Sequence, residues 1–203
     1  MVFSNFVIDF FSSLILIFKR FFLLIFFPYK TMRKISLEKD LFQPIIIFMM
    51  VFGYFQLSSG FRRTAYSSSV TFFVFLSYFL VSAFFFYLLG KFFEKKTDFF
   101  SYLITFSYSL FPTLVWFMAN FIFYILVPPP RTVSFLGKGF SIFFTAFSLS
   151  LLLWKLILFY LSIRFSSKAQ FYRIVYFIFL FFCWFIPLSV GLYQIKMFRI
   201  PFI

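Results

Sequence analysis

The stretch that decides the fold is FFFYLLGKFFEKKTDFFSYLITFSYSLFP, residues Phe84–Pro112. An apolar run ends at Gly90, a short charged segment follows, and a second apolar run continues to Pro112. Two membrane-spanning helices joined by a short basic loop produce this arrangement. The stretch therefore predicts a helical membrane hairpin.

The composition extends this prediction to the whole chain. The 203 residues are 64% hydrophobic and 45 of them are Phe, whereas soluble domains are roughly 45–50% apolar. A soluble fold of this length could not cover so much apolar surface, so the bilayer is its expected solvent. The predicted fold class is all-α, a polytopic membrane protein.

The net charge of +14 does not indicate a nucleic-acid partner. A basic soluble protein would suggest one, but here the cations lie in short loops between apolar runs, where topology and anionic lipid headgroups account for them. The chain has no His, and its single Cys183 lies in an apolar run. These residues supply no ligand set for zinc, haem or an iron–sulfur cluster, so no metal and no cofactor is expected.

Five candidate spans make up a predicted transmembrane domain over residues 41–203. Each has at least 20 residues, enough to cross a bilayer, and they cover 41–60, 67–90, 99–127, 134–163 and 171–195. Pro112 and Pro187 each remove a backbone hydrogen bond and should bend their helices. Pro44 falls in the first turn of its span, where proline costs little.

Residues 1–40 are predicted to form an interfacial N-terminal segment. Asp9 and the Lys19–Arg20 pair interrupt the apolar residues 3–27 and leave Phe10–Phe18 as the longest uninterrupted piece. That piece is too short to cross about 30 Å of hydrocarbon. We expect an interfacial or re-entrant helix here, and a tilted sixth span is the alternative.

The most polar stretch of the chain, residues 28–40, follows this segment. We expect a short amphipathic helix on the membrane surface, with Pro28 near its start. The cations expected to contact lipid headgroups are Lys19, Arg20, Lys30, Arg33 and Lys34.

The loops on the N-terminal side carry the larger share of the cations. Besides Lys19 and Arg20 they hold Lys30, Arg33, Lys34, Lys39, Lys91, Lys95, Lys96, Arg164, Lys168 and Arg173. The other side holds Arg62, Arg63, Arg131, Lys138, Lys196 and Arg199. This excess predicts a cytoplasmic N-terminus and a C-terminus on the opposite side.

Two polar seams are predicted to meet inside the membrane. The fourth span repeats with steps of four and three residues at Ser141, Thr145, Ser148, Leu152, Lys155, Phe159 and Ser162. In the third span one helix face carries Ser101, Thr105, Ser109, Pro112 and Trp116. Residues at such spacing share a face, and small hydroxyl residues on it let another helix approach closely.

The cation on the fourth-span seam needs a partner, because an intramembrane charge rarely faces lipid. The candidate intramembrane contact consists of Lys155, Tyr108, Ser109, Pro112, Ser148 and Thr145. In this interpretation Lys155 lies near Tyr108, Ser109 or the carbonyls freed by Pro112. Two alternatives stay open: its long stem leads the ammonium to the cytoplasmic headgroups, or the residue has a transport or coupling role.

Nothing in the sequence supports catalysis, and the chain is not expected to be an enzyme. Without His there is no Ser/His/Asp or Cys/His set. All five acids fall outside the spans, at Asp9, Glu38, Asp40, Glu94 and Asp98. A proton relay through the membrane therefore has no carboxylate to use, which weakens the transport alternative.

Three segments resemble the Yip-type (Yip-one domain) family of membrane proteins. FFPYKTMRKIS at 26–36 is similar to the family's entry into its first span, and LLGKFFEKKTDFFSYLITFSYSLFPTLV at 88–115 looks like its central signature, with Tyr108 and Pro112 four residues apart. LLLWKLILFYLSIRFSSKAQ at 151–170 resembles its fourth span. The resemblance extends over roughly residues 21–187, and it implies five spans with a cytoplasmic N-terminus.

The resemblance also implies a mode of action and a place. Eukaryotic Yip-type proteins lie in Golgi and endoplasmic-reticulum membranes and associate with one another and with Rab-type GTPases in vesicle trafficking. Short forms such as this one are typical of prokaryotic members. We therefore expect a non-enzymatic protein of a prokaryotic cytoplasmic membrane that acts by association with lipids, with membrane proteins or with itself. A mitochondrial inner membrane and a eukaryotic endomembrane are the alternative locations.

Two other functions compete with this expectation. One is a small subunit of a larger membrane complex, such as an organelle-encoded respiratory or ATP synthase subunit. The other is a small transporter or channel. Co-purification separates the first from a Yip-type protein, and an ion flux abolished by Lys155→Leu would favour the second.

Overall fold

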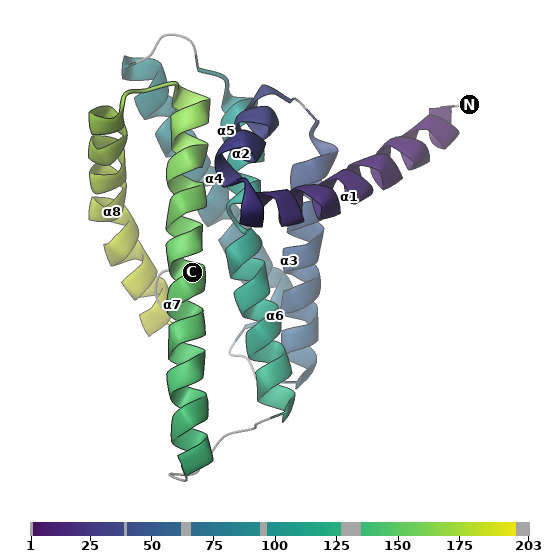
Figure 1. Cartoon of the computed structure of the whole chain (residues 1–203), viewed down its shortest axis with the longest axis vertical. Coiled ribbons are helices and arrows are strands. Elements are labelled where there is room, and N and C mark those ends of the chain that lie inside the picture. The colour runs from purple at the N-terminus through teal and green to yellow at the C-terminus, as the bar shows by residue number, and fades with distance from the viewer. Residues whose placement is uncertain (1, 39, 62–65, 94–96, 127–134, 198–203) are drawn as a thin grey trace.

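In the computed structural model, which describes residues 2–38, 40–61, 66–93, 97–126 and 135–197, the chain is helical throughout and forms no strand (Figure 1). The helices are α1 (Val2–Phe26), α2 (Pro28–Leu37), α3 (Phe42–Phe61), α4 (Ser68–Phe93), α5 (Phe99–Tyr108), α6 (Phe111–Leu126), α7 (Phe135–Ser167) and α8 (Phe171–Gln194). The loop residues Lys39, Arg62, Arg63, Glu94, Lys95, Lys96, Pro128–Pro130, Arg131 and Arg199 lie outside the described residues.

Five of the described helical segments are long and apolar enough to cross a membrane. They are α3, α4, the α5–α6 pair, Gly137–Ser167 of α7, and α8. Each begins or ends within a few residues of a predicted span. The all-α, five-span fold class is therefore confirmed, and the chain is an integral, multi-pass membrane protein.

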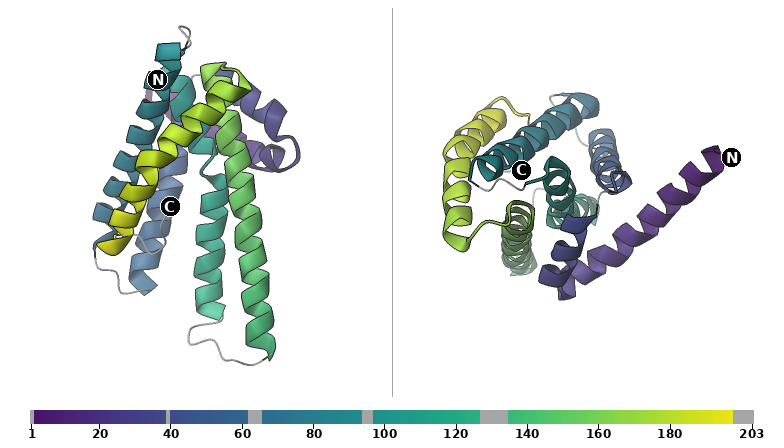
Figure 2. Two further views of the ribbon diagram at one scale, coloured as in Figure 1. Left: turned by 90° about the vertical axis from the view of Figure 1, so that its left-hand side faces the viewer. Right: turned by 90° about the horizontal axis from the view of Figure 1, so that it is seen from above.

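The five spans run alternately up and down a single bundle (Figures 1 and 2). The end that holds α2 also holds the last turn of α4, the first turn of α5, the last turn of α7 and the first turn of α8 (Figure 1). The described cations of the N-terminal-side loops, Lys91, Arg164, Lys168 and Arg173, lie at these helix ends. The structure therefore gathers at one end of the bundle the described helix ends that flank the basic loops assigned to one side from the sequence.

Pro112 divides the third span into two helices. It is the second residue of α6, and α5 ends four residues earlier at Tyr108. A tight turn joins them, in which the Leu110 amide donates to the Ser107 carbonyl over 3.1 Å. The bend predicted at Pro112 is confirmed as a full break, whereas α8 continues through Pro187.

The hairpin of α4 and α5 differs from its prediction at Gly90. The sequence interpretation ended the second span there, but α4 continues for three more residues to Phe93. Gly90 is buried in the helix, where an added Cβ would overlap the hydroxyl of Tyr102 on α5. This glycine therefore serves the close approach of α4 and α5 and does not end the helix.

Aromatic side chains fill the centre of the bundle. Phe86 of α4 is fully buried, and its ring centroid lies 5.3 Å from that of Phe106 on α5 and 4.9 Å from that of Phe181 on α8. Phe159 of α7 packs against the same ring at 5.4 Å. Four helices thus share one aromatic contact, a geometry that supplies large buried area without polar atoms.

The N-terminal segment forms two helices that pack on the bundle. α1 continues without interruption through Asp9, Lys19 and Arg20, and Pro28 is the first residue of α2, as predicted. α1 runs across the direction of the long helices, with its N-terminal part projecting away from them (Figures 1 and 2). Among the described residues, α1 is not one of the five segments that are long and apolar enough to span.

Candidate functional site

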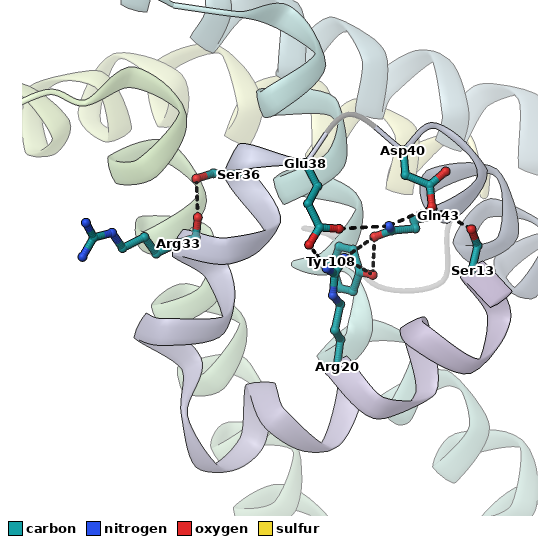
Figure 3. Close-up of polar contacts among 8 residues, drawn as sticks. All are labelled: Ser13, Arg20, Arg33, Ser36, Glu38, Asp40, Gln43 and Tyr108. Atoms are coloured by element: carbon teal, nitrogen blue, oxygen red, sulfur yellow. Dashed lines mark hydrogen bonds and ion pairs between the residues drawn. The ribbon is translucent and has the colours of Figure 1, made fainter. Parts of the chain in front are cut away.

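A buried cluster of polar side chains joins this N-terminal unit to the bundle (Figure 3). We call it the N-terminal polar cluster, and it consists of Ser13, Arg20, Glu38, Asp40, Gln43 and Tyr108. Its members come from α1, from the segment between α2 and α3, from the first turn of α3 and from the end of α5. Four separate parts of the chain therefore meet at one set of hydrogen bonds.

The inward face of α1 contributes two residues to this cluster, Ser13 and Arg20. Ser13, Ile17, Arg20 and Leu24 are each at most 5% exposed, and steps of three or four residues place them on one side of the helix. Lys19 is exposed because the neighbouring position points about 100° away. The pair that looks alike in the sequence is thus divided between the interior and the surface.

Arg20 is the centre of the cluster. Its guanidinium donates to the Gln43 side-chain oxygen and forms an ion pair with the carboxylate of Glu38. It also lies 3.3 Å from the Tyr108 hydroxyl and 5.7 Å from the centroid of that ring. Arg20 is 3% exposed, and a charge this buried is stable only with such partners.

Gln43 connects the remaining groups. Its oxygen also accepts a hydrogen bond of 2.6 Å from the Tyr108 hydroxyl. Its nitrogen donates to Asp40 over 2.9 Å and to Glu38 over 3.4 Å. An amide has two donor hydrogens and two acceptor lone pairs, so every hydrogen-bonding position of this fully buried side chain is used.

Asp40 ties the cluster to the start of α3. One carboxylate oxygen accepts the Phe42 amide over 2.9 Å, and the other accepts the Ser13 hydroxyl over 2.6 Å. The first contact satisfies an amide at the N-terminus of the helix, where a negative charge is favourable. The second holds α1 to the same carboxylate.

The ion pair sets the protonation of both partners. Burial alone would lower the pKa of Arg20, but the hydrogen bond and charge of Glu38 and of Tyr108 outweigh it and raise the pKa. Burial alone would raise the pKa of Glu38, but Arg20 outweighs it and holds the pKa below its ordinary value. Both groups are therefore charged at neutral pH, and the pair is intact there.

Acid is expected to weaken the N-terminal polar cluster. Because the pKa of Glu38 is lower in the folded protein than the ordinary 4.5, its stabilising contribution is complete above that value and is lost as the pH falls through the folded value. Thermal unfolding in detergent should show a Tm that falls with acid in the wild type and falls less in Glu38→Gln. Asp9→Asn, which removes an exposed carboxylate from α1, should keep the full acid-induced fall. An equal fall in all three proteins would contradict the assignment.

The two predicted seams meet, as expected. The Trp116 indole of α6 donates to the Ser148 hydroxyl of α7 over 3.1 Å. Higher in the bundle the Ser162 hydroxyl donates to the Thr105 carbonyl over 3.0 Å, and Thr105 also pairs with Ser166 at 2.9 Å. Small polar residues therefore hold α7 against the α5–α6 pair.

The expected contacts of Lys155 are not formed among the described residues. Tyr108 bonds to Gln43 and Arg20 instead, and the Ser109 hydroxyl donates to the Phe106 carbonyl over 2.7 Å. Lys155 is half-buried and takes part in no hydrogen bond or ion pair within the described part of the chain. The hydroxyl of Tyr108 thus bonds to Arg20 of α1 and to Gln43 and not to Lys155, and a position of Lys155 near the carbonyls freed by Pro112 stays a prediction.

The other members of that predicted contact also have partners of their own. Thr145 is exposed and donates to the Ser141 carbonyl over 2.8 Å, Ser148 pairs with Trp116, and Pro112 is buried. Ser148 thus takes part in helix packing, whereas the Thr145 hydroxyl bonds within its own helix, and no hydrogen bond joins either of them to Lys155 in the described part of the chain.

The cations expected at lipid headgroups lie at the surface, with one exception. Lys19, Lys30, Arg33 and Lys34 are exposed. Arg20 is a correction: it is 3% exposed and both terminal guanidinium nitrogens bond to protein groups, so it does not lie at the lipid headgroups. The sequence interpretation missed Glu38, Asp40 and Gln43 as its partners, although their closeness to the first span and the spacing of the buried α1 face were signals.

Comparisons with known proteins return no match: no protein-family model, no curated protein and no solved structure matches this chain.

Proposed function

We propose that the chain is a non-catalytic membrane protein of the Yip type that acts by association with membrane proteins and lipids. The observation that carries the proposal is the N-terminal polar cluster, which fixes a basic N-terminal unit to the end of a membrane bundle. A unit held by a buried ion pair and saturated hydrogen bonds keeps one orientation. It therefore presents the same surface to anything that approaches from that side.

The surfaces of the described helices suit lateral association. α7 is buried mainly toward its C-terminal end, at Leu158, Leu161 and Ile163. In its N-terminal half Ile142, Phe143 and Leu149 are 56–72% exposed, so this part of the helix offers a surface to lipid or to another helix. Ser141 and Thr145 of α7 are four residues apart and exposed, and both carry a small hydroxyl side chain. Such residues permit close helix contact in lipid. The segment resemblances to the Yip-type family agree with this mode of action.

The gathering of cations supports an orientation. Lys30, Arg33 and Lys34 on α2 lie at the same bundle end as Arg164 and Lys168. Cations accumulate on the cytoplasmic side of membrane proteins. In our proposal this end faces the cytoplasm, and the membrane is the cytoplasmic membrane of a prokaryote.

Co-purification with matched charge variants tests the proposal. The tagged full chain is extracted from its native membrane in mild detergent, and its partners are quantified by mass spectrometry. We expect one or more membrane proteins whose recovery falls several-fold in Lys30→Glu/Arg33→Glu. The control, Lys138→Glu/Lys196→Glu, reverses two exposed cations at the other end of the bundle and should keep the partners. Both variants must show the wild-type Tm.

Two results would contradict the proposal. A stoichiometric place in a respiratory or ATP synthase assembly would identify a subunit of that complex. An ion flux in vesicles that Lys155→Leu abolishes would identify a transporter or channel.

A further inference from the structure

The described part of the chain leaves an apolar stripe on α1 uncovered. Ile8, Phe11, Ile15, Phe18, Phe22 and Ile25 are 47–69% exposed. They recur at steps of three and four residues, so they form one continuous face along most of the helix. This face is distinct from the inward face of Ser13, Ile17, Arg20 and Leu24, which the bundle buries.

A third face of α1 is polar. Asp9, Ser12 and Lys19 are exposed, and at 100° per residue their helical positions lie between the inward face and the apolar stripe. α1 thus has an apolar face and a polar face at an angle to each other, besides the face that touches the bundle. A helix at a membrane surface has this division, with its apolar side buried about 5–10 Å into the boundary of headgroups and acyl chains.

The level at which α1 contacts the bundle agrees with a position at the membrane surface. Arg20 bonds to Gln43 at the start of α3, and the 20 residues of α3 extend about 30 Å, which is the thickness of the hydrocarbon core. Phe21 packs on Trp154 of α7 with ring centroids 6.1 Å apart. The part of α7 from its first residue, Phe135, to Trp154 is also about 28 Å long. α1 therefore joins the bundle at one end of a bilayer-length stretch.

The direction of α1 fits the same place, because it runs across the spans instead of along them (Figures 1 and 2). Its C-terminal end passes into α2, which packs near the end of the bundle and exposes Lys30, Arg33 and Lys34. These cations suit the phosphates of anionic lipids, which attract Lys and Arg side chains near the membrane surface. The cations of α2 complement anionic lipid headgroups, and α1 is continuous with the spanning helices. Both observations indicate that a lipid leaflet contacts the apolar stripe.

We propose that α1 is a membrane arm that lies within one leaflet, with its apolar stripe facing the acyl chains and with the cations of α2 at the lipid phosphates. The inference rests on the proposed function and specifies the lipid part of the association. The inference also accounts for Lys155. This residue follows Trp154, which contacts α1, so its ammonium lies close enough to the headgroups for the side chain to reach them.

Spin-label depth measurements on the full chain test the arm. In a Cys183→Ser background, single cysteines replace Phe11, Ile15, Phe18 or Phe22, and the labelled protein is reconstituted in vesicles of phosphatidylcholine and phosphatidylglycerol. We expect all four labels at one shallow depth, accessible to oxygen and protected from a water-soluble nickel complex. Labels at Ser12, Lys19 and Leu37 should be accessible to the nickel complex.

Two outcomes would overturn the arm. A steady increase of depth from position 11 to position 22, which are about 16 Å apart along a helix, would make α1 a transbilayer helix. Low accessibility of the stripe to both reagents would mean that protein, such as a second copy of this chain, covers it. Either result would leave the co-purification outcome unchanged, so the arm and the proposed association fail separately.

Discussion

Arg20→Leu is expected to release α1 and α2 from the bundle. The substitution leaves Glu38, Gln43 and Tyr108 without the cation that joins them. Removing one partner of a buried ion pair costs several kcal/mol, because the remaining charge is left unpaired. The Glu38 side chain is 29% exposed and can recover some solvation. Local opening should therefore become easier by about 2–3 kcal/mol, which corresponds to roughly 30- to 150-fold faster amide exchange in α2.

Lys19→Leu is the matched control for this experiment. It also replaces a cation by leucine, one position earlier in α1, where the side chain is exposed, so amide exchange in α2 should stay near the wild-type rate. Arg20→Lys should give an intermediate result, because an ammonium cannot reproduce the planar fork that bonds to two groups at once. Equal exchange in Arg20→Leu and Lys19→Leu would mean that the N-terminal polar cluster does not hold the N-terminal unit.

The membrane fold could be predicted because a lipid bilayer requires long, continuous apolar segments. Each span needs about 20 apolar residues, and this requirement is readable without knowing which helices touch. Pro112 and Pro28 were also readable, since a missing amide hydrogen acts locally on the helix that contains it. The seam between α7 and the α5–α6 pair was found because small residues at fixed steps mark a helix face.

The partner of each polar side chain could not be predicted in the same way. Tyr108 was expected to serve Lys155, a neighbour by span order, but it bonds to Arg20, which is 88 residues away in the chain. Periodicity shows which residues share a face and is silent on which two faces meet. Arg20 was grouped with Lys19 because adjacent cations look like one surface feature, although a helix turns them to different sides.

The span end at Gly90 was misread for a related reason. Glycine often marks the end of a helix because of its backbone freedom, but at position 90 its missing side chain is what matters. That requirement comes from Tyr102, which lies on the other arm of the hairpin. A local pattern cannot separate these two uses of glycine, whereas a packed neighbour does so directly.

Gly90→Ala is therefore expected to destabilise the protein, against the usual effect of the substitution. In an open helix interior, Ala is favoured over Gly by about 1 kcal/mol. At position 90 the new Cβ would overlap the Tyr102 hydroxyl and lie 3.2 Å from Cγ2 of Thr97 and 3.3 Å from Cζ of Tyr102. Overpacking of this kind costs about 1–3 kcal/mol, which exceeds the gain in helix propensity, so the Tm in detergent should fall.

Gly53→Ala and a double variant test whether the overlap with Tyr102 causes the loss of stability in Gly90→Ala. Gly53 lies inside α3 with nothing within 4 Å of an added Cβ, so the same substitution there should leave the Tm unchanged or raise it. Tyr102→Phe removes the oxygen that the Cβ added at position 90 would meet, and Gly90→Ala/Tyr102→Phe should recover most of the lost stability. Because the ring carbon stays close, recovery should be incomplete. Additive effects of the two substitutions would contradict the contact, since residues that touch show a coupling free energy in a double-mutant cycle.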